Sequence, residues 1–477
     1  MSALTLALTV LPAALPPPEP WEPPDQPAHH DVGRDLLERD TFGTFPNVHV
    51  ADRVVIKWGD AVEIEPLGVE QVAAAFEDSW TLFVDERGME PPVGSDTWLL
   101  NVYIGNTGAP APSIGTARGY FTTDDLGAPM IVLQPDRFEP GEPTAWETAT
   151  HELFHALQHA ERGRGGAGWT WFTEASATWA QEEVWDPARS AARRLPSYAT
   201  TPYRAIHVVD DSAPDWQLGV RHYGAFLLPR FLTERLDEDV VVDTLRGEGT
   251  ALDALSAAVA AREGDLPQLF GDFAAANATW DYSRGDLYAM VANAPVGATG
   301  YAVDAPPRGW PEWVSPPSDR RPEAWGWDLV RIPNPEPGVL RARFVSHAPC
   351  GVDAWVHIVK DTPGGPVRTP LVEGQRVGSA DLEVGTEPLA ISIAFTGAAS
   401  DPVDYQLFLE VSGASVPEVA VPGHDPGSCG EAAEPVEPRL GAWSAGCTHV
   451  PPPGAVGSGT AGFSLVLAAL LRRRRRA

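Results

Sequence analysis

Residues 144–178 read TAWETATHELFHALQHAERGRGGAGWTWFTEASAT, and this stretch decides how the chain folds around its most informative motif. Thr144 and Glu147 have the T-x-x-E spacing of a capping box, which predicts the start of a helix. This helix runs through His159 and ends in a cluster of glycines. A second helix follows over roughly residues 172–184. The glycine-rich turn between the two lets the second helix pack back against the first.

Within the first helix, His151, Glu152 and His155 form an H-E-x-x-H motif. Residues four apart lie on one helical face, so both imidazoles can reach one metal ion. Glu152 lies beside them, where its carboxylate can take a proton from water. Leu153 and Phe154 are apolar, as a half-buried site requires. The motif therefore predicts a catalytic zinc site with Glu152 as the general base.

A third ligand is expected at Glu174, which follows His155 after 18 intervening residues. Three protein ligands leave one position open for water, which is the coordination of catalytic zinc. Glu161 stands where a metzincin places its third histidine, but Gln158 replaces the glycine that lets that chain turn. Glu161 and Glu182 are the alternatives to Glu174.

These residues carry a resemblance to known peptidases. HELFH, then 18 residues, then WFTEASA is similar to the gluzincin type of zinc metallopeptidase. More narrowly, VVIKWG, HELFHALQH, WFTEASATWA and HYGAFLLPRFL resemble metalloproteases of myxobacterial surface proteins, over about residues 45–285. The resemblance implies a zincin fold, in which a small twisted sheet lies over the metal helix and a cleft separates it from a helical lobe. It also implies peptide-bond hydrolysis with one catalytic zinc ion.

The chain departs from the gluzincin pattern at Thr178, where an aspartate often orients a metal-bound histidine. A hydroxyl can accept the same imidazole N–H. His222 and Tyr223, at the start of a helix predicted over 223–236, are candidates to stabilise the oxyanion of the reaction, and the resemblance favours Tyr223. The alternative is that Tyr223 only caps or packs the helix. His159 is interpreted as a histidine that faces solvent, or that contacts the metal ligands without binding the metal itself.

The flanking patterns predict the rest of the fold. Upstream, apolar runs indicate strands at 54–58, 98–104 and 130–133 and a helix at 69–83. Downstream, helices are expected at 251–262 and 266–282. The period then changes to two, which indicates short strands at 327–332, 339–344, 353–359, 389–393 and 405–411. The predicted fold class is an α+β, zincin-like catalytic domain with a small twisted sheet and a helical lobe, followed by an all-β sandwich domain.

Composition limits the partners. A chain of 477 residues indicates two or three domains, and its 43% hydrophobic content allows a sizeable core. The net charge of −31 argues against nucleic acid and against direct docking on anionic lipid. The expected partner is a protein or peptide substrate, and the sequence gives no indication of an oligomeric state.

Both ends resemble targeting signals. The first twenty residues hold a short apolar run followed by Pro-Ala-Ala, typical of a signal peptide but without a basic n-region. The carboxyl-terminal segment starts at Cys447, continues with an apolar stretch and has five consecutive arginines, Arg472 to Arg476, near its end. This order resembles the C-terminal sorting signals of myxobacterial surface proteins, and a plain membrane helix is the alternative. Both readings predict an exported chain at the cell surface or outside the cell, with membrane contact through the tail only.

The predicted organisation is a signal peptide at 1–20, a linker or pro-segment at 21–44, a zinc metallopeptidase domain at 45–325, a β-sandwich accessory domain at 326–413, a Pro/acid-rich linker at 414–446 and a sorting or membrane-anchor tail at 447–477. The 3 cysteines include no C-x-x-C pair, which argues against a cysteine-based zinc or redox site. Cys350 and Cys429 can form a disulfide in an oxidising compartment, or remain two thiols.

The sequence therefore predicts a secreted or surface-anchored zinc endopeptidase. Two other classes of function stay open. A zincin-fold surface binding or adhesion protein without turnover would bind zinc with Glu152 displaced from the water. A structural surface-layer component with an accidental H-E-x-x-H would bind no metal tightly.

Overall fold

The computed structural model describes residues 42–412, except 125–126, 164–165, 167, 186–188, 210–218, 293–300, 303–311, 334 and 400. The predicted signal peptide, nearly all of the linker at 21–44, the linker at 414–446 and the sorting tail lie outside the described residues. Within the described part, no helix is both long and apolar enough to cross a membrane. Cys350 is in a disulfide. Both other cysteines lie outside the described residues, so its pairing with Cys429 stays a prediction.

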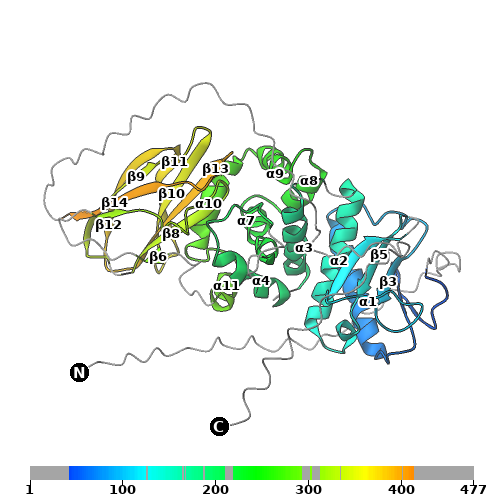
Figure 1. The fold of residues 1–477 in the computed structure, drawn as a ribbon. Helices are drawn as coiled ribbons and strands as arrows, with labels where there is room; N and C mark the ends of the chain where they lie inside the picture. The colour runs from blue at the N-terminus through cyan, green and yellow to red at the C-terminus, as the bar shows by residue number, and fades with distance from the viewer. Residues whose placement is uncertain are drawn as a thin grey trace, which may run out of the picture.

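A five-stranded sheet at the amino-terminal end positions the helix that carries the H-E-x-x-H motif (Figure 1). In spatial order its strands are β1 (Asn47–Val50), β2 (Val54–Trp58), β3 (Leu100–Ile104), β5 (Pro129–Leu133) and β4 (Gly119–Thr123). Strands β2, β3 and β5 are parallel, and β4 pairs antiparallel with β5 at the edge of the sheet. Side chains pack on both faces of β3 and β5, so these strands are buried throughout and the apolar runs of the sequence predict them.

Two long helices contact this sheet, and a third packs on the second of them. Helix α1 (Pro66–Trp80) continues as a π-helical segment η2 (Thr81–Glu86), which confirms the helix predicted over 69–83. Helices α2 (Pro143–Arg162) and α3 (Thr170–Val184) are the pair predicted around the glycine-rich turn. Helix α2 packs against α1 on one side and α3 on the other, and it also contacts β4. Its end is closed by Gly163 at φ 71°.

The capping box predicted at the start of α2 is wrong. The helix begins at Pro143, and the carboxylate of Glu142 accepts the N–H of Thr144 at 3.1 Å. The Thr144 hydroxyl donates to the same carboxylate and accepts a bond from Arg137, while Glu147 is buried. The fixed φ of a proline suits the first helical position, so Pro143 moves the start of the helix ahead of Thr144.

A helical lobe follows α3, with α4 (Arg189–Ala199), α6 (Arg221–Gly224), α7 (Leu227–Arg235), α8 (Val240–Arg246), α9 (Ala251–Ala260), α10 (Leu266–Asn277) and α11 (Gly285–Val291). Helices α9 and α10 confirm two predicted helices, although α10 ends before residue 282. The helix predicted over 223–236 is broken between α6 and α7. Pro229 has no N–H for the carbonyl of Ala225, which instead accepts a bond from Leu228 at 3.0 Å.

Two sheets form the carboxyl-terminal part of the described chain. One has the order β11 (Val367–Gln375), β10 (Val352–Lys360), β13 (Leu389–Gly397), β8 (Trp327–Ile332) and β6 (Tyr301–Ala302). The other has the order β12 (Val377–Val384), β9 (Gly338–Ser346), β14 (Tyr405–Ser412) and β7 (Glu312–Val314). Pairing is antiparallel except between β6 and β8. An apolar core contributed by both sheets confirms the sandwich-like arrangement.

The helical lobe and the sandwich share a packed junction (Figure 1). Helix α10 packs on β10 and β13, and a Cβ on Gly271 would lie 2.5 Å from the Cβ of Trp355. Trp327 donates its indole N–H to the hydroxyl of Tyr198 at 3.2 Å. One apolar core therefore runs from the small sheet through the helices to the near face of the sandwich. The predicted class, an α+β region followed by antiparallel sandwich sheets, is confirmed at this level.

Candidate metal centre

The three predicted metal ligands come together between α2 and α3. His151 and His155 are one turn apart on α2, and Glu174 lies near the start of α3. All three are buried, and their potential ligand atoms lie within 4.8 Å of one another. The group can therefore hold a metal ion.

The separations within this group are those of a small metal site. His151 Nε2 lies 3.2 Å from Glu174 Oε2 and 3.1 Å from His155 Nε2. His155 Nε2 lies 3.5 Å from the same carboxylate oxygen. Around a tetrahedral zinc ion with bonds of about 2.0–2.1 Å, neighbouring ligand atoms are about 3.3 Å apart. The three atoms thus form a triangle of the size expected for one face of that tetrahedron.

Gln158 orients one of the two imidazoles. Its side-chain amide nitrogen donates to the Thr173 carbonyl and to Ser176 Oγ, each at 2.9 Å. The amide oxygen therefore faces His155 Nδ1, 2.8 Å away. An amide oxygen only accepts, so Nδ1 carries a proton and Nε2 is the nitrogen that faces the other ligands.

Thr178 does not take the role that the sequence suggested. Its hydroxyl donates to the backbone carbonyl of Glu174 at 2.8 Å, within α3. For His155 the orienting partner is instead Gln158, the residue noted in the sequence only as a departure from the metzincin pattern. His159 packs its ring against Phe121, with 5.6 Å between ring centroids, and is not one of the three residues that meet at the site.

The two alternative ligands are engaged elsewhere. Glu161 pairs with Arg246 at 3.0 Å and accepts the backbone N–H of Glu90 at 2.9 Å. Glu182 accepts a hydrogen bond from the hydroxyl of Tyr288. Neither belongs to the cluster of possible ligands within the described chain.

The electrostatics of the group depend on the buried carboxylate. Burial alone would raise the pKa of Glu174, but His155 and His151 hold that pKa well below its usual range. Burial lowers the pKa of His151. Burial would also lower the pKa of His155, but Glu174 and Glu152 raise it to about 9. Glu174 is therefore an anion in the interior, where an anion needs a cation beside it, and a metal ion can provide that charge.

Glu152 lies between the metal group and the edge strand β4. The side chain is 4% exposed, and burial raises its pKa to about 7 although His155 and a hydrogen bond from the Phe121 backbone lower it. Among the described residues, Oε2 of Glu152 has no hydrogen-bond partner. A Cβ on Gly119 would lie 3.1 Å from Glu152 Cγ and 2.8 Å from a Leu133 methyl, so glycine gives this carboxylate its space.

Helix α6 brings His222 and Tyr223 to the same region. The Tyr223 ring lies 5.9 Å from the His151 ring and 4.4 Å from the His222 ring, measured between centroids. His222 is buried, and neither of its ring nitrogens has a partner among the described residues. Burial lowers its pKa to about 4, so at neutral pH the ring is uncharged with one N–H to donate. Arg221 holds α6 in place through hydrogen bonds to three backbone carbonyls.

Sequence reasoning missed three features of this site. Gln158 was not recognised as an orienting residue, Gly119 lies in a strand that was not predicted, and Arg194 lies in a helix that was not predicted. The Arg194 guanidinium carbon lies 4.7 Å from the centroid of the Tyr223 ring. The local sequence pattern does not reveal these contacts, because they depend on how α3, α4 and β4 are placed around α2.

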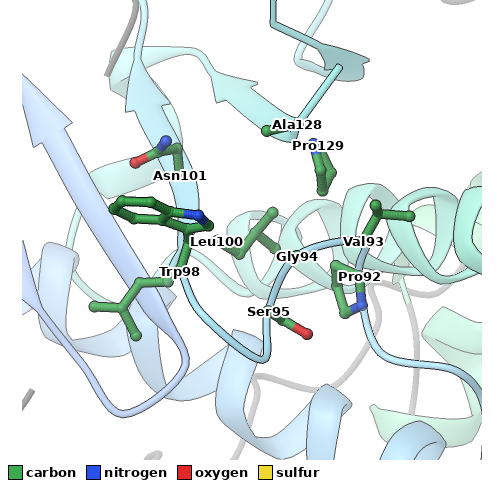
Figure 2. A pocket seen from close by; sticks show the side chains of 10 residues that line it. Pro92, Val93, Gly94, Ser95, Trp98, Leu100, Asn101, Ala128 and Pro129 are labelled. Carbon is green, nitrogen blue, oxygen red and sulfur yellow. The ribbon is translucent and has the colours of Figure 1, made fainter. Parts of the chain in front are cut away.

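A separate shallow pocket lies at the amino-terminal ends of β3 and β5 (Figure 2). Its lining comes from the segment before β3 and the turn before β5, with Trp98, Asn101 and Pro129 among its residues. None of the metal-binding residues lines it. This pocket is therefore not part of the candidate centre.

Comparison with known proteins adds little. No family model matches the chain, and no curated protein matches it. It is similar to the pre-peptidase C-terminal domain of a collagenase from Bacillus anthracis, at 8% identity over 24% of this chain and 98% of that one, with a TM-score of 0.17. It is also similar to a 4-O-methyl-α-glucuronidase with specificity for decorated arabinogalactans, at 12% identity over 69% of this chain and 52% of that one, with a TM-score of 0.14. Scores this low carry no argument about fold or function.

Proposed function

We propose that this chain is a zinc-dependent endopeptidase of the gluzincin type. The observation that carries the proposal is the triangle formed by His151, His155 and Glu174, with separations of 3.1, 3.2 and 3.5 Å. Two imidazoles and one carboxylate are the ligands of many catalytic zinc sites. When bound there, zinc would polarise a carbonyl and lower the pKa of water.

Glu152 is the proposed general base. It is on the turn of α2 between the two histidines, and one of its oxygens has no partner among the described residues. Its raised pKa, caused first by burial, suits a group that takes a proton from water and later passes it to the leaving amine. The backbone N–H of Phe121 donates a hydrogen bond to the Glu152 carboxylate, and the absence of a side chain at Gly119 leaves room for that carboxylate.

The edge strand β4 supports a peptide as the substrate. The strand pairs with β5 on one side only, and Glu152 lies along its other side. An extended peptide can add to such an edge through backbone hydrogen bonds, which would bring a scissile carbonyl past Glu152. His222 and Tyr223 then face the same space and are the proposed donors to the oxyanion. The uncharged, unpartnered His222 ring favours His222 at least as strongly as Tyr223.

The proposal includes export and a location at the cell surface or outside the cell. Its support is the order of Cys447, an apolar segment and five arginines in the sequence, together with the acidic charge of −31. Protease treatment of intact cells, followed by detection of the chain, would test this part independently of the chemistry.

The test uses the purified full chain. Bound zinc is quantified, and a mixed peptide library is incubated with the protein with and without a chelator. Glu152→Gln should keep one equivalent of zinc and lower cleavage by roughly 10²–10⁴-fold, because a general base contributes about that much. Glu161→Gln, the same change on the same helix away from the metal group, is the matched control and should keep both zinc and cleavage.

The other outcomes discriminate between the rival functions. Zinc without chelator-sensitive cleavage would contradict the peptidase and favour a surface binding or adhesion protein. Absence of tightly bound zinc would contradict the metal site itself.

A further inference from the structure

Three arginines lie on or beside elements that pack against the metal-ligand helix α2. Arg118 is the residue before β4, and Arg193 and Arg194 are on α4. The Arg194 guanidinium lies 4.7 Å from the centroid of the Tyr223 ring, and that ring lies 5.9 Å from the ring of His151. The arginines thus approach the site from two sides, from the edge strand and from the helical lobe. We refer to these three residues as the arginine cluster.

The members of the cluster act on one another. Burial lowers the pKa of Arg118, and the guanidinium groups of Arg137, Arg194 and Arg193 lower it further, while Asp136 raises it. Like charges affect each other in this way only when they are near. The cluster is therefore one positive region and not three separate side chains.

The cluster also borders the metal group. Arg194 lies over the ring of Tyr223, which is 5.9 Å from the ring of His151, and Gly119, the neighbour of Arg118, lies beside Glu152. The positive charge thus extends to the place where the proposed reaction occurs. A group that binds at the cluster would lie beside the catalytic residues.

Carboxylates are abundant in the chain, but the cluster has none. Asp136 is the acidic group that acts on Arg118, and both of its oxygens accept bonds from Arg137, at 3.0 and 2.9 Å. Within the described chain, no member of the cluster forms an ion pair. The chain has 65 acidic and 34 basic residues. Other arginines of the chain do pair with carboxylates, as Arg87, Arg230 and Arg262 do.

We propose that Arg118, Arg193 and Arg194 form a subsite for a carboxylate of the substrate, so that the site selects acidic peptides. The inference rests on the proposed peptidase function and names its substrate class. Guanidinium groups bind carboxylates through paired, charge-assisted hydrogen bonds. The carboxylate can be an Asp or Glu side chain or the carboxyl terminus of a peptide, because both present the same planar anion.

The position of the cluster fits this role. A peptide laid along β4 would pass Arg118, which directly precedes the strand, and Arg194 would face it from α4. The chain as a whole carries a net charge of −31, which repels acidic peptides. A local positive region would therefore attract such a peptide to this one place and fix which of its residues lies beside Glu152.

The test compares matched peptides. Starting from a peptide that the library assay shows to be cleaved, Glu is exchanged for Gln at each position in turn, and each peptide is made with a free and an amidated carboxyl terminus. The unmodified protein should prefer one acidic form by about 10–100-fold in kcat/KM, mostly through KM, as expected for hydrogen bonds to a charged group. The preferred form, side chain or terminus, identifies the source of the carboxylate.

Arginine variants then locate the subsite. In Arg118→Gln/Arg194→Gln, the ratio between acidic and neutral peptides should fall to about threefold or less, since the charge-assisted bonds are lost. Arg194→Lys keeps the charge and should restore part of the ratio. Arg341→Gln, in the sandwich, is the matched control and should keep the full ratio and activity. Thermal unfolding of each variant shows whether it is folded.

A binding measurement separates this inference from the proposed function. Fluorescent acidic and neutral peptides are titrated into zinc-loaded Glu152→Gln protein, with the arginine changes added. Cleavage without acidic preference would overturn the subsite and leave the peptidase intact. Absence of cleavage, with arginine-dependent binding of acidic peptides, would support the subsite and contradict the peptidase. Equal binding of acidic and neutral peptides without cleavage would overturn both.

Discussion

Helix α3 carries two buried glutamates, and the two ends of this helix differ in what faces them. Glu174 and Glu182 are 5% and 0% exposed. Glu174 meets the ring nitrogens of two histidines on α2, at 3.2 and 3.5 Å. Glu182 instead accepts a hydrogen bond from Tyr288 and lies 3.6 Å from Arg284. The same residue type, buried twice on one helix, therefore belongs to a candidate metal site at one end and to a packing contact with Tyr288 and Arg284 at the other.

The pKa values show what decides between these roles. Burial is the largest influence on both carboxyls and raises both. The histidines nonetheless bring the pKa of Glu174 well below its usual range, while Arg284 and Tyr288 leave that of Glu182 raised to about 7. Burial of a glutamate therefore does not by itself identify it as a metal ligand. The side chains that face the carboxylate from other helices distinguish Glu174 from Glu182.

The largest expected difference is in metal affinity. Glu174→Gln should lower zinc affinity by more than the roughly 10–100-fold that follows loss of an outer hydrogen-bond partner, because a ligand is removed. Glu182→Gln should change it by about twofold or less, since distant sites couple weakly. Competition with a chromogenic chelator measures both. Similar losses in the two variants would contradict the assignment of Glu174.

A smaller effect is expected from Gln158→Leu. This change removes the acceptor that holds His155 Nδ1 and should lower zinc affinity by about 10–100-fold. Gln71→Leu, which removes a buried glutamine that bonds the backbone of Gly141 away from the metal group, is the control. Unchanged affinity in Gln158→Leu would mean that another group sets the tautomer of His155.

A separate effect, which does not involve the metal, concerns stability and pH. Because the pKa of Glu182 is raised in the folded protein, its contribution is fully present below about pH 4.5 and is lost as pH rises through about 7. Between pH 5 and 8.5 the unmodified protein should lose on the order of 3 kcal/mol relative to Glu182→Gln. Urea unfolding at several pH values gives this difference. Parallel pH profiles for the two proteins would contradict it.

The sequence predicted the metal group because its geometry is local. Two histidines at i and i+4 must share a helical face, and the glycine-rich turn is short enough to return Glu174 to them. Gln158 takes its role only because α3 packs on α2 and offers Thr173 and Ser176 to its amide. Arg194 reaches Tyr223 from another helix, so both roles depend on packing that no local pattern contains. The position of Glu152 beside β4 likewise depends on packing, because it requires a glycine at position 119 of a strand that the local pattern did not predict.

The fold shows a similar division. Strands β3, β5, β8, β10 and β13 are apolar and mostly buried, and all were predicted. Strand β4 is half-exposed at an edge, and β11 and β12 are mostly exposed or half-exposed and rich in polar residues, so their sequences resemble loops. The two short strands β6 and β7 precede residue 326 and pair within the sandwich, so pairing begins earlier in the chain than the predicted start of that domain.

The place of β14 has a mechanical consequence if the chain is held by its carboxyl end, as the proposed surface location implies. This strand is the last of the described chain, and it lies between β9 and β7, with 8 paired residues toward β9 and 3 toward β7. Tension along the strand must therefore shear hydrogen bonds to both neighbours together, instead of peeling an outer strand one bond at a time. A surface tether attached here would pull on the interior of a sheet, and the sandwich would resist that force before it reached the helical lobe.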